Sequence, residues 1–215
     1  MVKDQLRCCL INQDYDTIVH LAGTTSRVLS FLTALTYDED RLISWRAIEA
    51  IGLAAARIAD EDPEPVRVHL RRMQWLLNDE SGGIGWRLPE AMGEIIYNRP
   101  RLFPEFVSIV ITLFDLEEED VAKFRPGILW AIGRIAQVSP EIDRALALPW
   151  IIPCLDDTDS QTRGLAVWCL GHLGVTEQLT ARDVLFNDGG PIELYLDGQL
   201  VETSVAELAR QALRP

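Results

Sequence analysis

Histidine and cysteine, the side chains that most often carry out chemistry near neutral pH, are few and widely separated in this sequence. Nucleophilic catalysis needs a base within hydrogen-bond reach of the nucleophile, and a metal ion needs several ligands together. No Cys-x-x-Cys pair occurs, and the glycine-rich stretch SGGIGW (81–86) lacks the Lys-Ser/Thr of a phosphate-binding loop. We therefore identify no catalytic residue and expect neither a cofactor nor a metal site. The histidines and cysteines are His20, His69, His172, Cys8, Cys9, Cys154 and Cys169.

The segment EFVSIVITLF (105–114) has the composition of a core or binding element, because no charged residue follows Glu105. Its β-branched residues favour a strand, whereas the repeat register described below favours a helix. A helix that is apolar all round is either buried or covered by a partner. Two interpretations stay open: burial between neighbouring repeats, or an apolar groove or self-association face formed with Leu148, Trp150 and Ile151.

Three arginines stand out in an acidic chain. Arg67 and Arg71 are four residues apart with Arg72 beside them, so a helix projects them to one side. Guanidinium groups suit an acidic peptide or a phosphate, and the alternative is a solvated face paired with local acids. The predicted partner-binding residues are Arg67, Arg71, Phe106, Ile109, Val110, Leu113 and Trp150.

The elements that would position these residues follow from a repeated glycine. Four similar segments end in glycine at intervals of 41, 40 and 38 residues, and a period near 40 is typical of stacked helix pairs. A glycine inside a helix costs roughly 1 kcal/mol relative to alanine, so its recurrence indicates close approach of a neighbouring helix. The segments are SWRAIEAIG (44–52), GWRLPEAMG (85–93), RPGILWAIG (125–133) and RGLAVWCLG (163–171).

A second helix is expected after each glycine helix. Proline in the first turn marks the start of these helices, over residues 63–79, 100–115 and 139–157. Pro149 and Pro153 should break or kink the third one. A truncated first unit covers 16–40, and an incomplete last unit includes 180–190.

The stretch DDTDSQTRGLAVWCLGHLG (156–174) resembles the HEAT-like repeat named after phycobilisome lyases. LPWIIPCLDD (148–157) is similar to the second helix of such a unit, and the resemblance covers roughly residues 25–187, with Ser44 and Gly85 in place of an arginine. It implies an α-solenoid whose second helices line the inner surface. It implies little about activity, because the family includes chromophore lyases, hydroxylases and scaffolds. The His-Glu pairs that the iron-dependent hydroxylases use do not occur here.

The C-terminal segment differs from the repeats. Asp197-Gly198 between two apolar-rich runs predicts a type I′ hairpin, and Ser204 with Glu207 predicts a capped helix. We expect an all-α fold: a solenoid of about four to five HEAT-like helix pairs over residues 1–187, with a hairpin-helix cap over 188–215 packed on the last repeat. The alternative role of the hairpin is strand addition by a partner peptide at its open edge.

Charge narrows the class of partner. The 215 residues carry 20 basic and 33 acidic side chains, a net charge of −13, which disfavours nucleic acid and favours basic partners. No segment reads as a membrane span or a signal peptide, so we expect a cytoplasmic protein. Acidic clusters recur at the turns, where they solvate the chain or recruit a basic partner. They are Asp38-Glu39-Asp40, Asp79-Glu80, residues 117–120 and Asp156-Asp157-Asp159.

Two functions are carried forward. The first is a non-catalytic scaffold that binds another protein or peptide on the inner face of the solenoid, with homo-oligomers also possible. The second, implied by the resemblance, is a lyase-like or chaperone subunit that handles a tetrapyrrole-type chromophore or its client. Cys154 or Cys169 would then take part in this second function. A stripe of side chains at the equivalent position of successive repeats would either stack on a planar ligand or fill space between the repeats. That stripe is Glu49, Glu90, Trp130 and Trp168.

Overall fold

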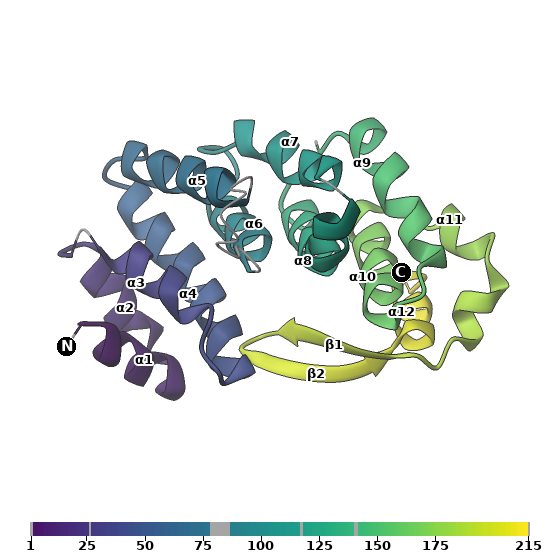
Figure 1. Ribbon diagram of the computed structural model, residues 1–215, viewed down its shortest axis with the longest axis horizontal. Helices are drawn as coiled ribbons and strands as arrows, with labels where there is room; N and C mark the ends of the chain where they lie inside the picture. The colour runs from purple at the N-terminus through teal and green to yellow at the C-terminus, as the bar shows by residue number, and fades with distance from the viewer. Residues whose placement is uncertain (1, 26, 78–86, 117, 140–141, 215) are drawn as a thin grey trace. The chain divides into compact units, whose positions relative to one another are not determined.

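The computed structural model describes residues 2–25, 27–77, 87–116, 118–139 and 142–214, without the side chains of 118–121. Within these ranges the chain is mostly helical and has the α-solenoid fold, with twelve α-helices and one two-stranded antiparallel sheet (Figure 1). It forms two compact units, Met1–Phe106 (the N-terminal unit) and Val107–Pro215 (the C-terminal unit). None of the described helices is long and apolar enough to cross a membrane.

The helices follow the predicted alternation of glycine helices and second helices. The four glycines lie in α4, α6, α8 and α10, and the next helices along the chain are α5, α7, α9 and α11. In the N-terminal unit the bounds are α1 Val2–Asn12, α2 Tyr15–Ala22, α3 Val28–Leu35, α4 Arg41–Ala59, α5 Glu64–Leu77 and α6 Leu88–Asn98. They continue with α7 Glu105–Thr112, α8 Glu118–Ala136, α9 Arg144–Ile151, α10 Ser160–Leu173, α11 Glu177–Thr180 and α12 Val205–Ala212.

Side chains at the turns fix where several helices begin. The Asp40 carboxylate accepts hydrogen bonds from the backbone N–H of Leu42 and Ile43 at 2.9 and 3.4 Å, and Asp159 caps α10 in the same way. An aspartate at this position satisfies backbone donors that have no partner inside the helix. Some of the acidic residues at the turns therefore serve helix initiation.

Gly52, Gly133 and Gly171 lie at close helix contacts, as the sequence predicts. A Cβ atom added at Gly52 in α4 would lie 2.8 Å from the backbone oxygen of Glu94 in α6. One added at Gly133 in α8 would overlap the ring of Trp168 in α10, and one at Gly171 would lie 3.0 Å from the Cβ of Ala212 in α12. Gly93 is buried in α6. Closer contact between helices thus explains why glycine stands at these positions, although its helix propensity is poorer than that of alanine.

Two further predictions about local structure are confirmed. The apolar segment at 105–114 is helical, as α7 followed by a 3-10 turn at Leu113–Asp115. The second helix after Gly133 changes form next to Pro153, because a proline offers no N–H to the α-helical ladder, whereas Pro149 lies inside α9. Helix α9 ends at Ile151, and a 3-10 turn follows over Ile152–Asp156.

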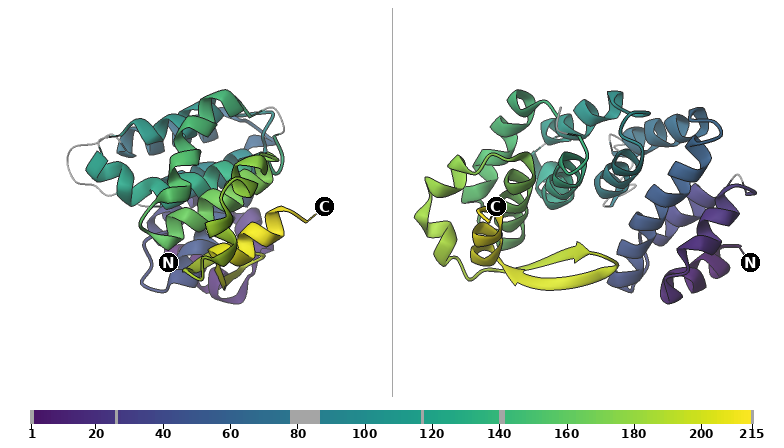
Figure 2. Two further views of the ribbon diagram at one scale, coloured as in Figure 1. Left: turned by 90° about the vertical axis from the view of Figure 1, so that its right-hand side faces the viewer. Right: turned by 180° about the vertical axis from the view of Figure 1, so that it is seen from behind.

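The C-terminal hairpin pairs β1 (Pro191–Leu196) with β2 (Gln199–Ser204). Asp197 and Gly198 have φ of 47° and 77°, the two positive values that a type I′ turn requires. Ser204 accepts a hydrogen bond from the Glu207 N–H at the start of α12. In Figure 1 and Figure 2 the hairpin and α12 lie beside α10, with which both make contacts. The domain boundary between 187 and 188 stays a prediction, since the compact units divide between 106 and 107.

Candidate protein-binding surfaces

The structure corrects the predicted apolar surface. Phe106, Val110 and Leu113 are 2%, 0% and 4% exposed, so they belong to the protein interior and do not line an open face. Ile109 is half-buried. The segment is uncharged because it is buried, which was the other interpretation of its composition. Of the apolar residues in the predicted set, Trp150 is placed where it can meet a partner.

Arg67 is also engaged within the N-terminal unit. Its Nε donates to the Glu105 carboxylate at 2.9 Å, its Nη2 donates to the Leu102 carbonyl at 2.8 Å, and its guanidinium lies 5.7 Å from the centre of the Phe103 ring. These contacts tie α5 to the segment that precedes α7. Arg71 lies nearer to solvent and pairs with Glu64 at 3.0 Å. The alternative of arginines paired with local acids therefore describes both residues.

An exposed face of α5 joins Arg71 and Arg72 to two large apolar side chains that the sequence analysis missed. Val68 is 56% exposed and Trp75 is 64% exposed. The positions 68, 71, 72 and 75 share one side of a helix, and this spacing is the signal that could have found them. Exposed tryptophan and arginine together are common in protein interfaces.

The C-terminal unit contains a groove with a cavity volume of about 330 Å³. The ring of Phe114 stacks on that of Trp150, with centroids 6.0 Å apart and planes 4° from parallel. Phe114 is buried, Trp150 is half-buried, and the exposed prolines Pro149 and Pro153 form the rim. We call this site the aromatic groove. It is lined by Phe114, Arg125, Pro149, Trp150, Pro153, Cys154 and Asp157.

Trp150 lies between the two prolines of the groove rim, Pro149 and Pro153. In the 3-10 turn that follows α9, the Cys154 thiol donates to the Trp150 carbonyl at 3.2 Å. Burial raises the pKa of this thiol to about 11. Cys154 is therefore protonated at neutral pH and contributes an apolar surface to the groove, with little nucleophilic thiolate.

An ion pair closes the polar end of the aromatic groove. Arg125 Nη1 donates to Oδ2 of Asp157, and Oδ1 of Asp157 accepts the backbone N–H of Asp159 at 2.9 Å. Each carboxylate oxygen has further lone pairs that can accept a hydrogen bond. The groove thus offers an apolar aromatic wall beside a carboxylate that can take an additional donor.

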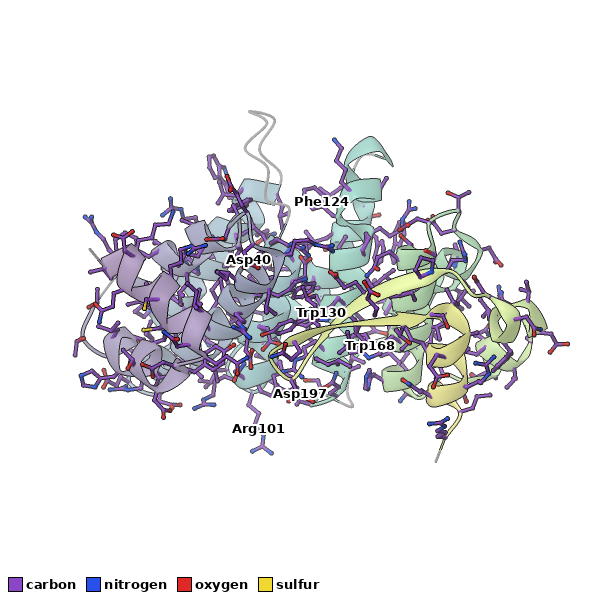
Figure 3. The ribbon with its side chains drawn as sticks, turned by 90° about the horizontal axis from the view of Figure 1, so that it is seen from below. Asp40, Arg101, Phe124, Trp130, Trp168 and Asp197 are labelled. Carbon is purple, nitrogen blue, oxygen red and sulfur yellow. The ribbon has the colours of Figure 1, made fainter. Side chains whose placement is uncertain are left out.

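Three of the four positions of the stripe are buried, whereas Glu49 is half-buried and accepts a hydrogen bond from the Tyr15 hydroxyl at 2.7 Å. Trp130 and Trp168 are 2% and 8% exposed and stack with their centroids 6.4 Å apart, at the contact of α8 with α10 (Figure 3). Glu90 is 2% exposed, and burial raises its pKa. Burial likewise raises the pKa of the Cys169 thiol. These side chains fill space between repeats and do not form an open face for a planar ligand.

The two units differ in charge. Val107–Pro215 contains 8 basic and 17 acidic side chains, a net charge of −9, whereas Met1–Phe106 contains 12 and 16, a net charge of −4. Several arginines of the C-terminal unit are already paired, as Arg125 with Asp157 and Arg163 with Asp188. The unit that contains the aromatic groove is therefore the more strongly acidic one.

Comparison with known proteins supports the repeat fold. Residues 123–173, which include α10 and most of α8, match the model of the HEAT-like repeat. An uncharacterized protein of Archaeoglobus fulgidus is 29% identical over 113 residues, which are 53% of this chain and 54% of that protein. The chain thus spans about half the length of the curated relative it matches.

Two solved structures share the fold over nearly the whole chain. A designed armadillo repeat protein in complex with the peptide (KR)4 is 18% identical, with a TM-score of 0.50, and the match covers 98% of each chain. An engineered protein is 16% identical with a TM-score of 0.51, covering 99% of this chain and 95% of the other. The predicted resemblance to HEAT-like repeats is confirmed, and the function within such proteins is not determined by it.

Proposed function

We propose that this α-solenoid, which contains a HEAT-like repeat at residues 123–173, is a non-catalytic scaffold that binds a basic segment of another protein. In this proposal the aromatic groove of the C-terminal unit is the contact site. The observation that carries it is the half-buried Trp150 stacked on Phe114 in an open groove of an acidic unit.

The groove suits the side chain of arginine or lysine. The methylene stem of such a residue can lie along the apolar wall while its charged end stays near water. A cation over the face of a tryptophan ring gains about 0.5–2 kcal/mol, depending on its solvation. The Asp157 carboxylate at the polar end has acceptor capacity beyond its bonds to Arg125 and Asp159.

The charge of the unit favours the same partner. A net charge of −9 over Val107–Pro215 raises the local concentration of a cationic segment and speeds its association. The likeness to a designed armadillo repeat protein in complex with (KR)4 is in keeping with a basic peptide as partner, although it concerns the fold alone. All four cysteines are free thiols, in keeping with a reducing compartment such as the cytoplasm.

A fluorescently labelled octapeptide of alternating Lys and Arg tests the proposal by anisotropy titration against the full chain. The Trp150→Ala variant should bind about tenfold more weakly, because it removes the exposed face of the aromatic pair. Trp75→Ala is the matched control: it removes a tryptophan that is exposed outside the groove, and should leave the dissociation constant unchanged. Equal binding by wild type and Trp150→Ala would exclude the groove as the site.

Chromophore handling has less support as an alternative. It relied on the tryptophan stripe and on Cys154 or Cys169, and these side chains are buried or have raised thiol pKa values. Addition of a free tetrapyrrole with recording of its absorbance tests this alternative directly. An unchanged spectrum is the result we expect.

A further inference from the structure

The two outer edges of the C-terminal hairpin are treated differently by the fold. At the edge of β1, the Gln161 side chain acts like a neighbouring strand: its Nε2 donates to the Glu193 carbonyl at 2.7 Å, and its Oε1 accepts the Glu193 N–H at 2.9 Å. Ser160 also donates to the Pro191 carbonyl at 2.8 Å. Both residues come from the first turn of α10, so the helix that supports the hairpin also occupies the edge of β1.

The edge of β2 has no such cover. In a two-residue hairpin the pair next to the turn, Leu196 and Gln199, exchanges hydrogen bonds, and every second pair beyond it does the same. The N–H and C=O groups of Leu200 and Glu202 therefore point away from β1. Among the described residues, no hydrogen bond reaches these backbone groups.

From this asymmetry we infer that β2 is a docking edge to which a partner protein adds an extended, basic strand. The main-chain groups of Leu200 and Glu202 supply two donors and two acceptors in the spacing that an antiparallel strand requires. Exposed edges are usually blunted by lysine, proline or a covering segment. The sequence of β2, QLVETS, contains neither lysine nor proline, and its one charged residue is Glu202.

The side chains of the hairpin define the chemistry of the added strand. Glu202 is exposed and lies directly opposite Glu193, a like-charge pair that is unfavourable on a sheet surface. On the other face Val201 and Leu196 are 43% and 39% exposed. A strand that alternates cationic and β-branched residues would place a positive charge beside Glu202 and an apolar side chain beside Val201.

The same charges disfavour a second copy of this chain as the occupant. Pairing β2 with its own copy would bring two Glu202 side chains together, in units that each carry a net charge of −9. Like charges on adjacent strands are destabilising, whereas opposite charges contribute favourably. The edge is therefore assigned to a basic partner segment, separate from the aromatic groove.

An octapeptide of alternating Lys and Val, labelled with fluorescein and titrated against the full chain, tests this inference. In antiparallel pairing the residue opposite Glu202 is a lysine whose N–H faces β2, so N-methylation of the lysines should weaken binding at least tenfold. N-methylation of the valines, whose N–H groups face away, is the matched control and should change binding less than twofold. Equal binding of the lysine-methylated and unmodified peptides would overturn the inference.

A protein variant tests the same edge from the other side. Leu200→Pro removes an outward N–H but spares the hydrogen bonds between β2 and β1. This variant should bind the Lys-Val peptide at least fivefold more weakly, whereas Leu200→Ala controls for the lost side chain. Trp150→Ala should leave this peptide unaffected, which separates the edge from the groove. Unchanged affinity in Leu200→Pro, or a dimer in sedimentation that this variant abolishes, would contradict a basic partner at β2.

Discussion

Replacing Gly133 by alanine should destabilise the C-terminal unit by about 1–3 kcal/mol, although alanine is the better helix former by roughly 1 kcal/mol. The added Cβ would overlap the ring of Trp168 and lie 3.2 Å from the Cα of Cys169. The Trp168 ring cannot move freely, because it stacks on Trp130 and makes a T-shaped contact with the His172 ring, with centroids 4.6 Å apart. Overpacking of a dense contact therefore outweighs the gain in helix propensity.

The measurement is urea unfolding of the full chain followed by circular dichroism. Gly189→Ala is the matched control, since a Cβ at that exposed position meets nothing within 4 Å, and its effect should stay within about 0.5 kcal/mol. Gly171→Ala, with its Cβ 3.0 Å from that of Ala212, should fall between the two. A Gly133→Ala variant as stable as wild type would show that the glycine has no packing role.

The double variant Gly133→Ala/Trp168→Leu separates crowding from other effects of the substitution. If the clash with the indole ring causes the loss, the smaller side chain should restore part of the stability. The coupling free energy of the two substitutions should then exceed about 1 kcal/mol. Additive effects would mean that the two residues do not act on each other.

Lowering the pH from 7 to 5 should reduce the free energy of unfolding by about 2 kcal/mol through His69 alone. Burial lowers the pKa of this imidazole to about 4, and the nearby charge of Arg72 acts in the same direction. In the unfolded chain the pKa lies near 6.5, so the unfolded state binds the proton first as the pH falls. The contribution of His69 to stability is therefore fully present above pH 6.5 and is lost progressively down to pH 4.

His69→Gln keeps a polar side chain that can hydrogen-bond to Thr33, the partner of His69 Nε2 at 3.2 Å, but it has no titrating group. The variant should lose about 2 kcal/mol less than wild type between pH 7 and pH 5, measured as the difference between two urea series. Other groups, including His172, contribute equally to both series and cancel. Identical pH dependence in the two proteins would contradict a neutral, half-buried His69.

The regular part of the fold could be predicted because it leaves either a repeated or a local signal in the sequence. The glycine period set the register of α4, α6, α8 and α10, and Pro149 and Pro153 marked the change of helix type. Asp197-Gly198 specifies its turn through backbone conformation alone. The prolines and the turn dipeptide act over a few residues, whereas the glycines lie at contacts between helices and are recognised by their period of about 40 residues.

The candidate site was predicted in part only, because burial and pairing are tertiary properties. An apolar helix can be buried or bound, and composition does not distinguish the two, so Phe106 and Val110 were assigned to a surface that they do not form. Arg67 meets Glu105, 38 residues away, which no local pattern indicates. Trp150 was found, but its partner Phe114 lies 36 positions earlier in the chain and was not.

The most direct test of the account follows the tryptophan indole N–H signals of the isotope-labelled full chain by NMR during titration with the alternating Lys-Arg octapeptide. We predict that the Trp150 signal moves progressively and saturates, while those of the buried Trp130 and Trp168 stay in place. A peptide that binds with the Trp150 signal unmoved, or that does not bind at millimolar concentration, would contradict a basic partner in the aromatic groove.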